Sequence, residues 1–159
     1  MIPDARLWDK LNAEGKATGP RPKERVKRKR NYEESDNQKS FFKWWRASHA
    51  AFNVPQCLVF AIPNGSALGT GKEDWQVLQR VIRGRRLIAE GLTPGVLDIF
   101  VSVAFGGFHG CYVEMKKKGG EMNPQQVIFK AAAEAWGYKT VVCYSDREAI
   151  DAVTTYLTK

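Results

Sequence analysis

The chain has 159 residues, of which 43% are hydrophobic and 26% charged, and this is enough for one globular domain with a hydrophobic core. The absence of an apolar run that could span a bilayer, and of an apolar segment near the start, argues against a membrane role and a secretory signal. We therefore expect a cytoplasmic protein. The formal net charge of +8 favours a polyanionic partner, most often a nucleic acid.

The first part of the chain is predicted to be a flexible basic arm. Residues 12–31 are rich in Gly, Pro, Lys and Arg and nearly free of large apolar side chains. We assign residues 1–31 to this arm and residues 32–159 to a folded domain. A solvated tail, a nuclear address and a DNA-contacting arm all remain open for it.

The composition changes after residue 31, where "EESDNQKSFFKWWRASHA" predicts the first helix. We expect Ser35 or Asp36 to be its N-cap. Four aromatic residues stand in this segment, namely Phe41, Phe42, Trp44 and Trp45. They are typical of a core face or of a base-stacking surface, and the apolar surface beyond what one core needs could form a two-fold interface.

The next segment predicts a strand at residues 57–62, which ends at the turn signal Pro63-Asn64-Gly65. The loop that follows contains glycines and Lys72 but lacks the spacing of a phosphate-binding P-loop, so we expect no nucleotide cofactor. The three cysteines lie far apart in apolar contexts and have no zinc-site spacing. We expect them to be reduced core residues.

Residues 75–90 predict a second helix with an apolar stripe on one side and arginines on the other, closed by Gly91. Residues 96–116 predict two strands joined at Gly106-Gly107 as a β-hairpin. A third helix follows, with Asn123 as N-cap and Gly137 at its end, then a strand and a last helix capped by Ser145. This order of elements predicts an α/β fold, a mixed central sheet flanked by helices.

Both strands of the predicted hairpin carry charged residues in apolar surroundings. Glu114 and Lys116 are two residues apart and therefore share one face of their strand. A loop centred near Gly106 or Gly107 places Asp98 opposite Glu114 or Lys116, and in either register the three side chains share a face. A slip of one residue would send the Asp98 carboxylate to the other face.

This arrangement suggests a metal site with a catalytic base. Two adjacent carboxylates repel each other unless a cation neutralises them, and Mg²⁺ typically takes one or two carboxylates together with water and phosphate oxygens. A lysine beside the metal can hold or deprotonate a water molecule and stabilise negative charge on a phosphate. The alternative is a structural Glu–Lys pair on a half-exposed face.

Four short motifs occur in order: "IPNG", "GVLD", "EMK" and "NPQQ" at the start of a helix. This set resembles the VRR-NUC family of the PD-(D/E)XK nuclease superfamily, over about residues 34–156. The resemblance implies a restriction-endonuclease-like core and a Mg²⁺- or Mn²⁺-dependent deoxyribonuclease that hydrolyses phosphodiester bonds. One departure is Leu97, which stands where the family usually has proline before the aspartate.

The resemblance also implies roles for individual residues. The implied catalytic residues are Asp98, Glu114, Lys116 and Gln126, and the implied metal ligands are Glu34, Asp98, Glu114 and the Met115 carbonyl. Glu33 and Asp36 compete with Glu34 for the acid ahead of the first helix, and Gln38 lies one turn further on. Gln126 has a second reading, because Asn123 and Gln126 also match a capping box.

The remaining expectations concern partners. The residues expected to attract DNA phosphates are Arg80, Arg83, Arg86, Lys117 and Lys118. The resemblance implies a homodimer that prefers branched DNA, four-way (Holliday) junctions above all, in the cytoplasm of a bacterium or a phage-infected host. The rival interpretation is a non-catalytic nucleic-acid-binding module on the same fold.

Overall fold

The computed structural model describes residues 10, 12–15, 33–63 and 74–159. Contacts divide the chain into two units, Met1–Asn31 and Tyr32–Lys159. Of the first unit only residues 10 and 12–15 are described, so most of the predicted arm lies outside the described residues and its flexibility stays a prediction. The second unit carries the sheet and the residues expected to be functional.

The described part of the second unit contains a four-stranded mixed sheet in the order β1-β2-β3-β4. The strands are β1 (Val59–Ala61), β2 (Ile99–Val101), β3 (Cys111–Met115) and β4 (Lys139–Cys143). β1, β2 and β3 are antiparallel neighbours, whereas β3 and β4 run parallel and are joined through a helix, as a parallel pair requires. The predicted fold class is confirmed.

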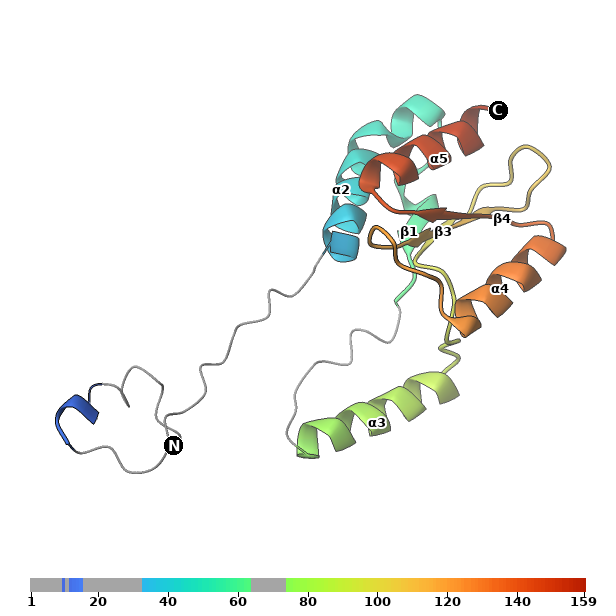
Figure 1. Ribbon diagram of the computed structural model, residues 1–159. Helices are drawn as coiled ribbons and strands as arrows, with labels where there is room; N and C mark the ends of the chain where they lie inside the picture. Colours follow the sequence, from blue (N-terminus) through green and yellow to red (C-terminus); the bar gives the residue numbers. More distant parts are fainter. Residues whose placement is uncertain (1–9, 11, 16–32, 64–73) are drawn as a thin grey trace. The chain divides into compact units, whose positions relative to one another are not determined.

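Helices cover both faces of this sheet (Figure 1). α2 (Glu33–Ser48) and α5 (Asp146–Thr158) pack against each other and against β3. α4 (Pro124–Ala135) packs on the other face, where the ring of Phe129 meets that of Tyr112 edge-on at 5.0 Å. α3 (Asp74–Ala89) forms where the second helix was expected, and Gly91 follows it with φ +103°.

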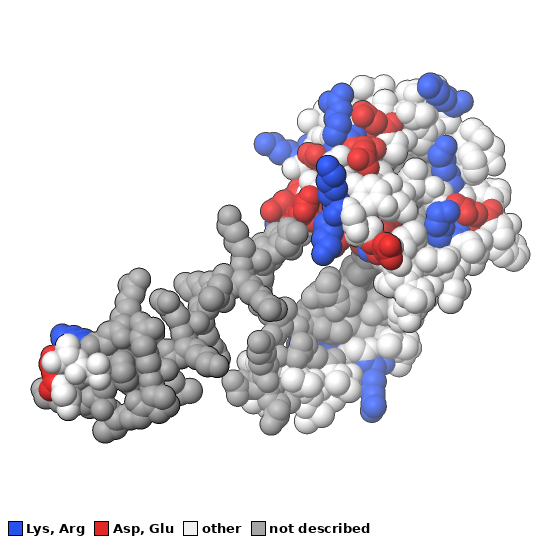
Figure 2. All heavy atoms as spheres, in the orientation of Figure 1, with Lys and Arg blue, Asp and Glu red and all other residues white. Residues whose placement is uncertain are grey.

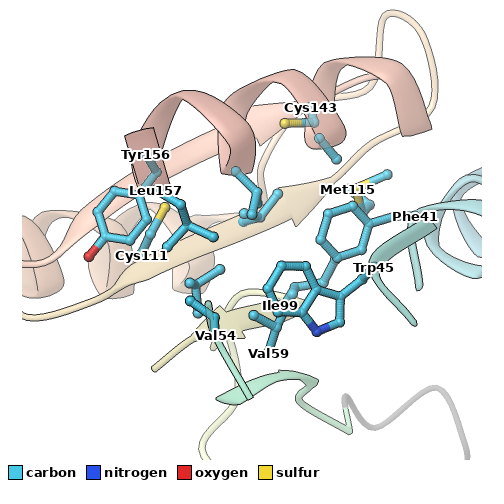
Figure 3. Close-up of a cluster of buried hydrophobic side chains, with 14 residues drawn as sticks. Phe41, Trp45, Val54, Val59, Ile99, Cys111, Met115, Cys143, Tyr156 and Leu157 are labelled. Carbon is cyan, nitrogen blue, oxygen red and sulfur yellow. The ribbon is translucent and has the colours of Figure 1, made fainter. Parts of the chain in front are cut away.

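The hydrophobic core lies between the sheet and the α2–α5 layer (Figure 3). Phe41 and Trp45 of α2 are buried against strand residues such as Ile99, Val113 and Met115. Phe42 and Trp44 pack against the edge of the same core and are partly buried. Phe41 and Trp45 are thus core residues, whereas Phe42 and Trp44 keep part of their rings exposed, and the expected two-fold interface on this helix stays a prediction.

The hairpin between β2 and β3 contains a one-residue irregularity that sets the register. Phe105 pairs with Phe108 around the predicted Gly106-Gly107 turn, and extending that pairing would place Asp98 opposite Met115. The ladder instead pairs Ile99 with Val113, because residues 102–104 on one side face only residues 109 and 110 on the other. This extra residue acts as a β-bulge and brings Asp98 opposite Glu114.

The helix caps predicted for α4 and α5 are confirmed, whereas the N-cap predicted for α2 and the core position predicted for Cys57 are wrong. Asn123 and Ser145 cap α4 and α5 as expected. α2 begins at Glu33, so Ser35 and Asp36 lie inside the helix and are not its N-cap. Cys57 lies in a 3-10 turn (Gln56–Leu58) ahead of β1 and is exposed, whereas the other two cysteines are buried free thiols.

Candidate active site

Asp98 is held at the start of β2 by its neighbours and by a backbone contact. Leu97 and Ile99, on either side of it, are fully buried, so the chain is anchored in the core at this point. Its Oδ2 accepts a hydrogen bond of 3.0 Å from the backbone N–H of Met115 on β3. Leu97 thus fills a buried position, and the alternation of side chains along an extended chain directs the aspartate to the opposite side.

Glu114 is the most deeply buried charged residue in the described part of the chain, with 1% of its surface exposed. Its Oε1 is 2.7 Å from the Lys116 ammonium and accepts a 2.5 Å hydrogen bond from the Gln126 side chain. Its Oε2 is also buried and has no hydrogen-bond partner among the described residues. One oxygen of a buried carboxylate is thus engaged, and the other has no partner from the described part of the chain, although buried polar atoms usually have one.

The surroundings change the proton affinity of this carboxyl group. Burial raises the pKa of Glu114 above its ordinary value, because an ionised carboxylate is poorly solvated inside the protein. The hydrogen bond from Lys116 opposes this rise, and the negative charge of Asp98 adds to it. A cation at Oε2 would offset both the cost of burying the negative charge and the repulsion between the two carboxylates.

Gln126 forms the capping box expected for it and also contacts Glu114, while its catalytic role stays a prediction. Its backbone N–H donates to Asn123 Oδ1 at 2.9 Å and its Oε1 accepts from the Asn123 N–H at 3.0 Å, which completes the capping box of α4. The other end of the same amide, Nε2, donates to Glu114. The cap therefore fixes the direction in which the amide N–H₂ group points.

Glu34 at the start of α2 reaches the end of β3. Its Oε1 accepts a 3.0 Å hydrogen bond from the backbone N–H of Lys117, the residue after Lys116. Of the competing acids, Asp36 pairs instead with Lys39 at 3.0 Å. The structure thus places Glu34 near the site, while its role as a metal ligand stays a prediction.

The residues present fit a divalent cation held by few protein ligands. Within the described ranges, no cluster of three or more His, Cys, Asp and Glu side chains could hold a metal. Asp98 and Glu114 are close enough to influence each other, and the unpartnered Glu114 Oε2 offers a hard oxygen ligand. Two carboxylates with backbone and water oxygens match the preference of Mg²⁺, which keeps several waters.

The residues expected to contact DNA are only partly brought to the site. Lys117 and Lys118 follow Lys116 just after the end of β3 and are exposed. Arg83 and Arg86 are exposed on α3, where Arg86 pairs with Glu90 at 2.7 Å, and the side chain of Arg80 lies outside the described residues. Figure 2 shows basic and acidic side chains interspersed on the visible face of the described part.

Two contacts of the site were not foreseen from the sequence, and both involve backbone N–H groups. Asp98 holds the N–H of Met115 and Glu34 holds that of Lys117. Every non-proline residue carries such a donor, so no residue type signals the contact. The sequence indicated only that Glu114 and Lys116, two residues apart, share one face of their strand.

No protein-family model matches the sequence, and no curated protein matches it. Among solved structures, the fold is similar to that of a chain described as "VRR_NUC domain protein", with a TM-score of 0.60 and 19% sequence identity. The similarity covers 78% of this chain and 87% of the other. The second unit therefore has the mixed-sheet α/β fold seen in that VRR_NUC domain protein, which is a restriction-endonuclease-like architecture.

Proposed function

We propose that the chain is a metal-dependent endonuclease of the VRR-NUC type that hydrolyses phosphodiester bonds in DNA. The observation that carries this proposal is the buried Glu114 carboxylate, which has one oxygen bound to Lys116 and Gln126 and the other without a partner in the described ranges. The fold similarity and the net charge of +8 support it. The chain-wide charge favours a polyanionic substrate.

Asp98 and Glu114 would hold Mg²⁺ or Mn²⁺, with the Met115 carbonyl and Glu34 as further oxygen ligands. The bound metal would supply Lewis acidity towards a phosphate oxygen and a water molecule. Lys116, only 14% exposed, would hold the attacking water and stabilise negative charge on the phosphate. Gln126 would position the Glu114 carboxylate through its side-chain amide, whose oxygen is held by the N–H of Asn123.

A cleavage assay tests this function directly. The full chain is incubated with linear duplex, flap and four-way junction DNA in Mg²⁺, in Mn²⁺ and in EDTA. We expect cleavage in either metal and none in EDTA, and its loss in Lys116→Met but not in Lys43→Ala, which removes an exposed lysine of α2. DNA binding without cleavage in any metal would instead favour the non-catalytic binding module.

We further propose that the protein acts as a homodimer and prefers branched DNA, four-way junctions above all. Cutting two strands of a junction requires two sites, which a symmetric dimer supplies. Exposed apolar side chains on α3 would supply an interface, since Trp75, Leu78 and Ile82 are 64%, 60% and 58% exposed. Equal cleavage rates on linear duplex and junction would leave a general endonuclease.

A further inference from the structure

A hollow of about 210 Å³ runs along one side of α2. The residues that line it are Ser35, Gln38, Lys39, Phe42 and Arg46. Their spacing of three or four residues places them on one side of the helix, next to the side that buries Phe41 and Trp45 in the core. The hollow thus opens on the solvent side of the helix that begins at the candidate active site.

The lining combines three kinds of chemistry. Phe42 contributes a half-buried aromatic ring whose other side is fixed by an edge-on contact with Phe41 at 5.3 Å. The side chains of Ser35, Gln38 and Arg46 make no hydrogen bond or ion pair within the described part of the chain. Lys39 forms an ion pair with the exposed Asp36, and such a pair contributes little in water.

The hollow begins within one helical turn of the candidate active site. Ser35 follows Glu34 directly, and Gln38 stands one turn after Glu34 on the helix. Glu34 in turn binds the backbone N–H of Lys117, next to Lys116. A ligand in the hollow would therefore lie beside a substrate phosphate at Lys116.

We propose that this hollow binds one unpaired nucleotide of the substrate strand, adjacent to the phosphate that is cut. The base would lie against the ring of Phe42, with its polar edge hydrogen-bonded by Gln38 and Ser35. The flanking phosphate would pair with Arg46, and Lys39 would add positive charge. This inference rests on the proposed nuclease function and names the feature by which the site selects its substrate.

An unpaired nucleotide fits this chemistry better than a base pair. In a duplex the base faces are stacked and the Watson–Crick edges are occupied, so only phosphates would reach the two cations. An unpaired base exposes one face for an aromatic ring and one edge for an amide, which is how single strands are usually recognised. The hollow would then distinguish flaps and junctions from continuous duplex.

Binding measured without cleavage tests this inference. Fluorescence anisotropy in EDTA compares the full chain on a blunt duplex and on the same duplex with a short single-stranded flap that carries 2-aminopurine. The variants are Gln38→Ala, Phe42→Leu, which keeps apolar contact with the core, and Arg46→Ala. Lys43→Ala is the matched control, since Lys43 is an exposed cation of the same helix outside the hollow.

We expect tighter wild-type binding to the flap, and a loss of about tenfold in flap affinity for Phe42→Leu, the size typical of one stacked base. Duplex affinity of Phe42→Leu should change by no more than about twofold, as should both affinities of Lys43→Ala. Arg46→Ala removes a phosphate contact and should lower flap affinity more than duplex affinity. The 2-aminopurine signal of the flap should change on binding wild type and not on binding Phe42→Leu.

Two results would overturn the inference. These are equal wild-type affinity for both probes and equal losses on both probes in the hollow variants. Because no metal is present, the result is independent of catalysis. A flap preference in a protein that never cleaves would contradict the nuclease proposal and leave the nucleotide site standing.

Discussion

Gln126 Nε2 donates a 2.5 Å hydrogen bond to Glu114 Oε1, and this bond joins the first turn of α4 to the end of β3. The oxygen of the same amide accepts from the Asn123 N–H, so the orientation of the amide is fixed by the helix cap. Gln126, the last residue of the capping box, thereby orients a buried carboxylate twelve positions earlier in the chain.

Replacing Gln126 by alanine should weaken both stability and metal binding. Asn123→Ala is the matched control, because it removes the cap and leaves the Gln126 side chain in place. Each change should cost about 1 kcal/mol of unfolding free energy, the usual value of an N-cap. Only Gln126→Ala should also lower Mg²⁺ affinity, measured by calorimetry. Equal metal affinities in the two variants would contradict a positioning role for Gln126.

Lys116→Met should abolish cleavage and lower the stability of the metal-free protein. The change leaves the buried Glu114 carboxylate without its cation, which costs about 3 kcal/mol when a buried pair is broken. In the double variant Lys116→Met/Glu114→Gln most of this loss should be recovered, because no buried charge remains. Urea unfolding in EDTA measures each variant. A loss that persists in the double variant would show that lysine packing, not charge, is responsible.

Glu114→Gln should stabilise the metal-free protein at neutral pH, and the gain should shrink in acid. The raised pKa of Glu114 means that the folded state binds its proton more tightly than the unfolded chain, so the wild type carries a penalty above that pKa. The penalty is lost as the pH falls through the raised pKa and is absent below the ordinary value of 4.5. Thermal unfolding of both proteins in EDTA, from neutral pH to below 4.5, measures the difference; a pH-independent difference would refute the assignment.

Mg²⁺ should make the wild type more stable than Glu114→Gln, the reverse of the order expected in EDTA. A ligand that binds only the folded state raises its stability, and the wild type keeps the carboxylate that the cation needs. We therefore expect added Mg²⁺ to raise the melting temperature of the wild type and to leave Glu114→Gln nearly unchanged. An equal rise in both proteins would place the cation elsewhere.

Deleting residues 1–31 should weaken DNA binding and flatten its dependence on salt without removing the chemistry. The segment from Arg21 to Arg30 contains seven Lys and Arg residues. Each duplex phosphate contact that is lost lowers the slope of log affinity against log salt by about 0.9. Binding titrations at several salt concentrations measure this slope. An unchanged slope would mean that the arm does not contact DNA.

Ile82→Glu should convert the proposed dimer into a monomer. Ile82 is exposed on the apolar side of α3, and a charge there would be buried without a partner in an interface formed by this side. Arg83→Gln, on the same helix, is the control and should remain dimeric. Light scattering of the three proteins gives their masses. A monomeric wild type at working concentration would refute the dimer.

The sequence alone determined the features that depend on near neighbours. The capping box at Asn123 and Gln126, the cap at Ser145 and the Gly106-Gly107 turn all formed as predicted. Each of these is satisfied within a few residues, so the residue types suffice to predict it. The common face of Glu114 and Lys116 follows from the period of a strand in the same way.

Only the tertiary structure decided which distant groups meet. The bulge at residues 102–104 sets the register that brings Asp98 opposite Glu114, where the regular turn alone would have paired it with Met115. The choice of Glu34 over Asp36 depends on a backbone N–H more than eighty residues away. Burial of Glu114 beside Lys116 and Gln126 depends on α4 packing over the sheet. Such contacts form because a folded chain must bury its apolar faces and satisfy its buried polar groups together, and no local pattern records that requirement.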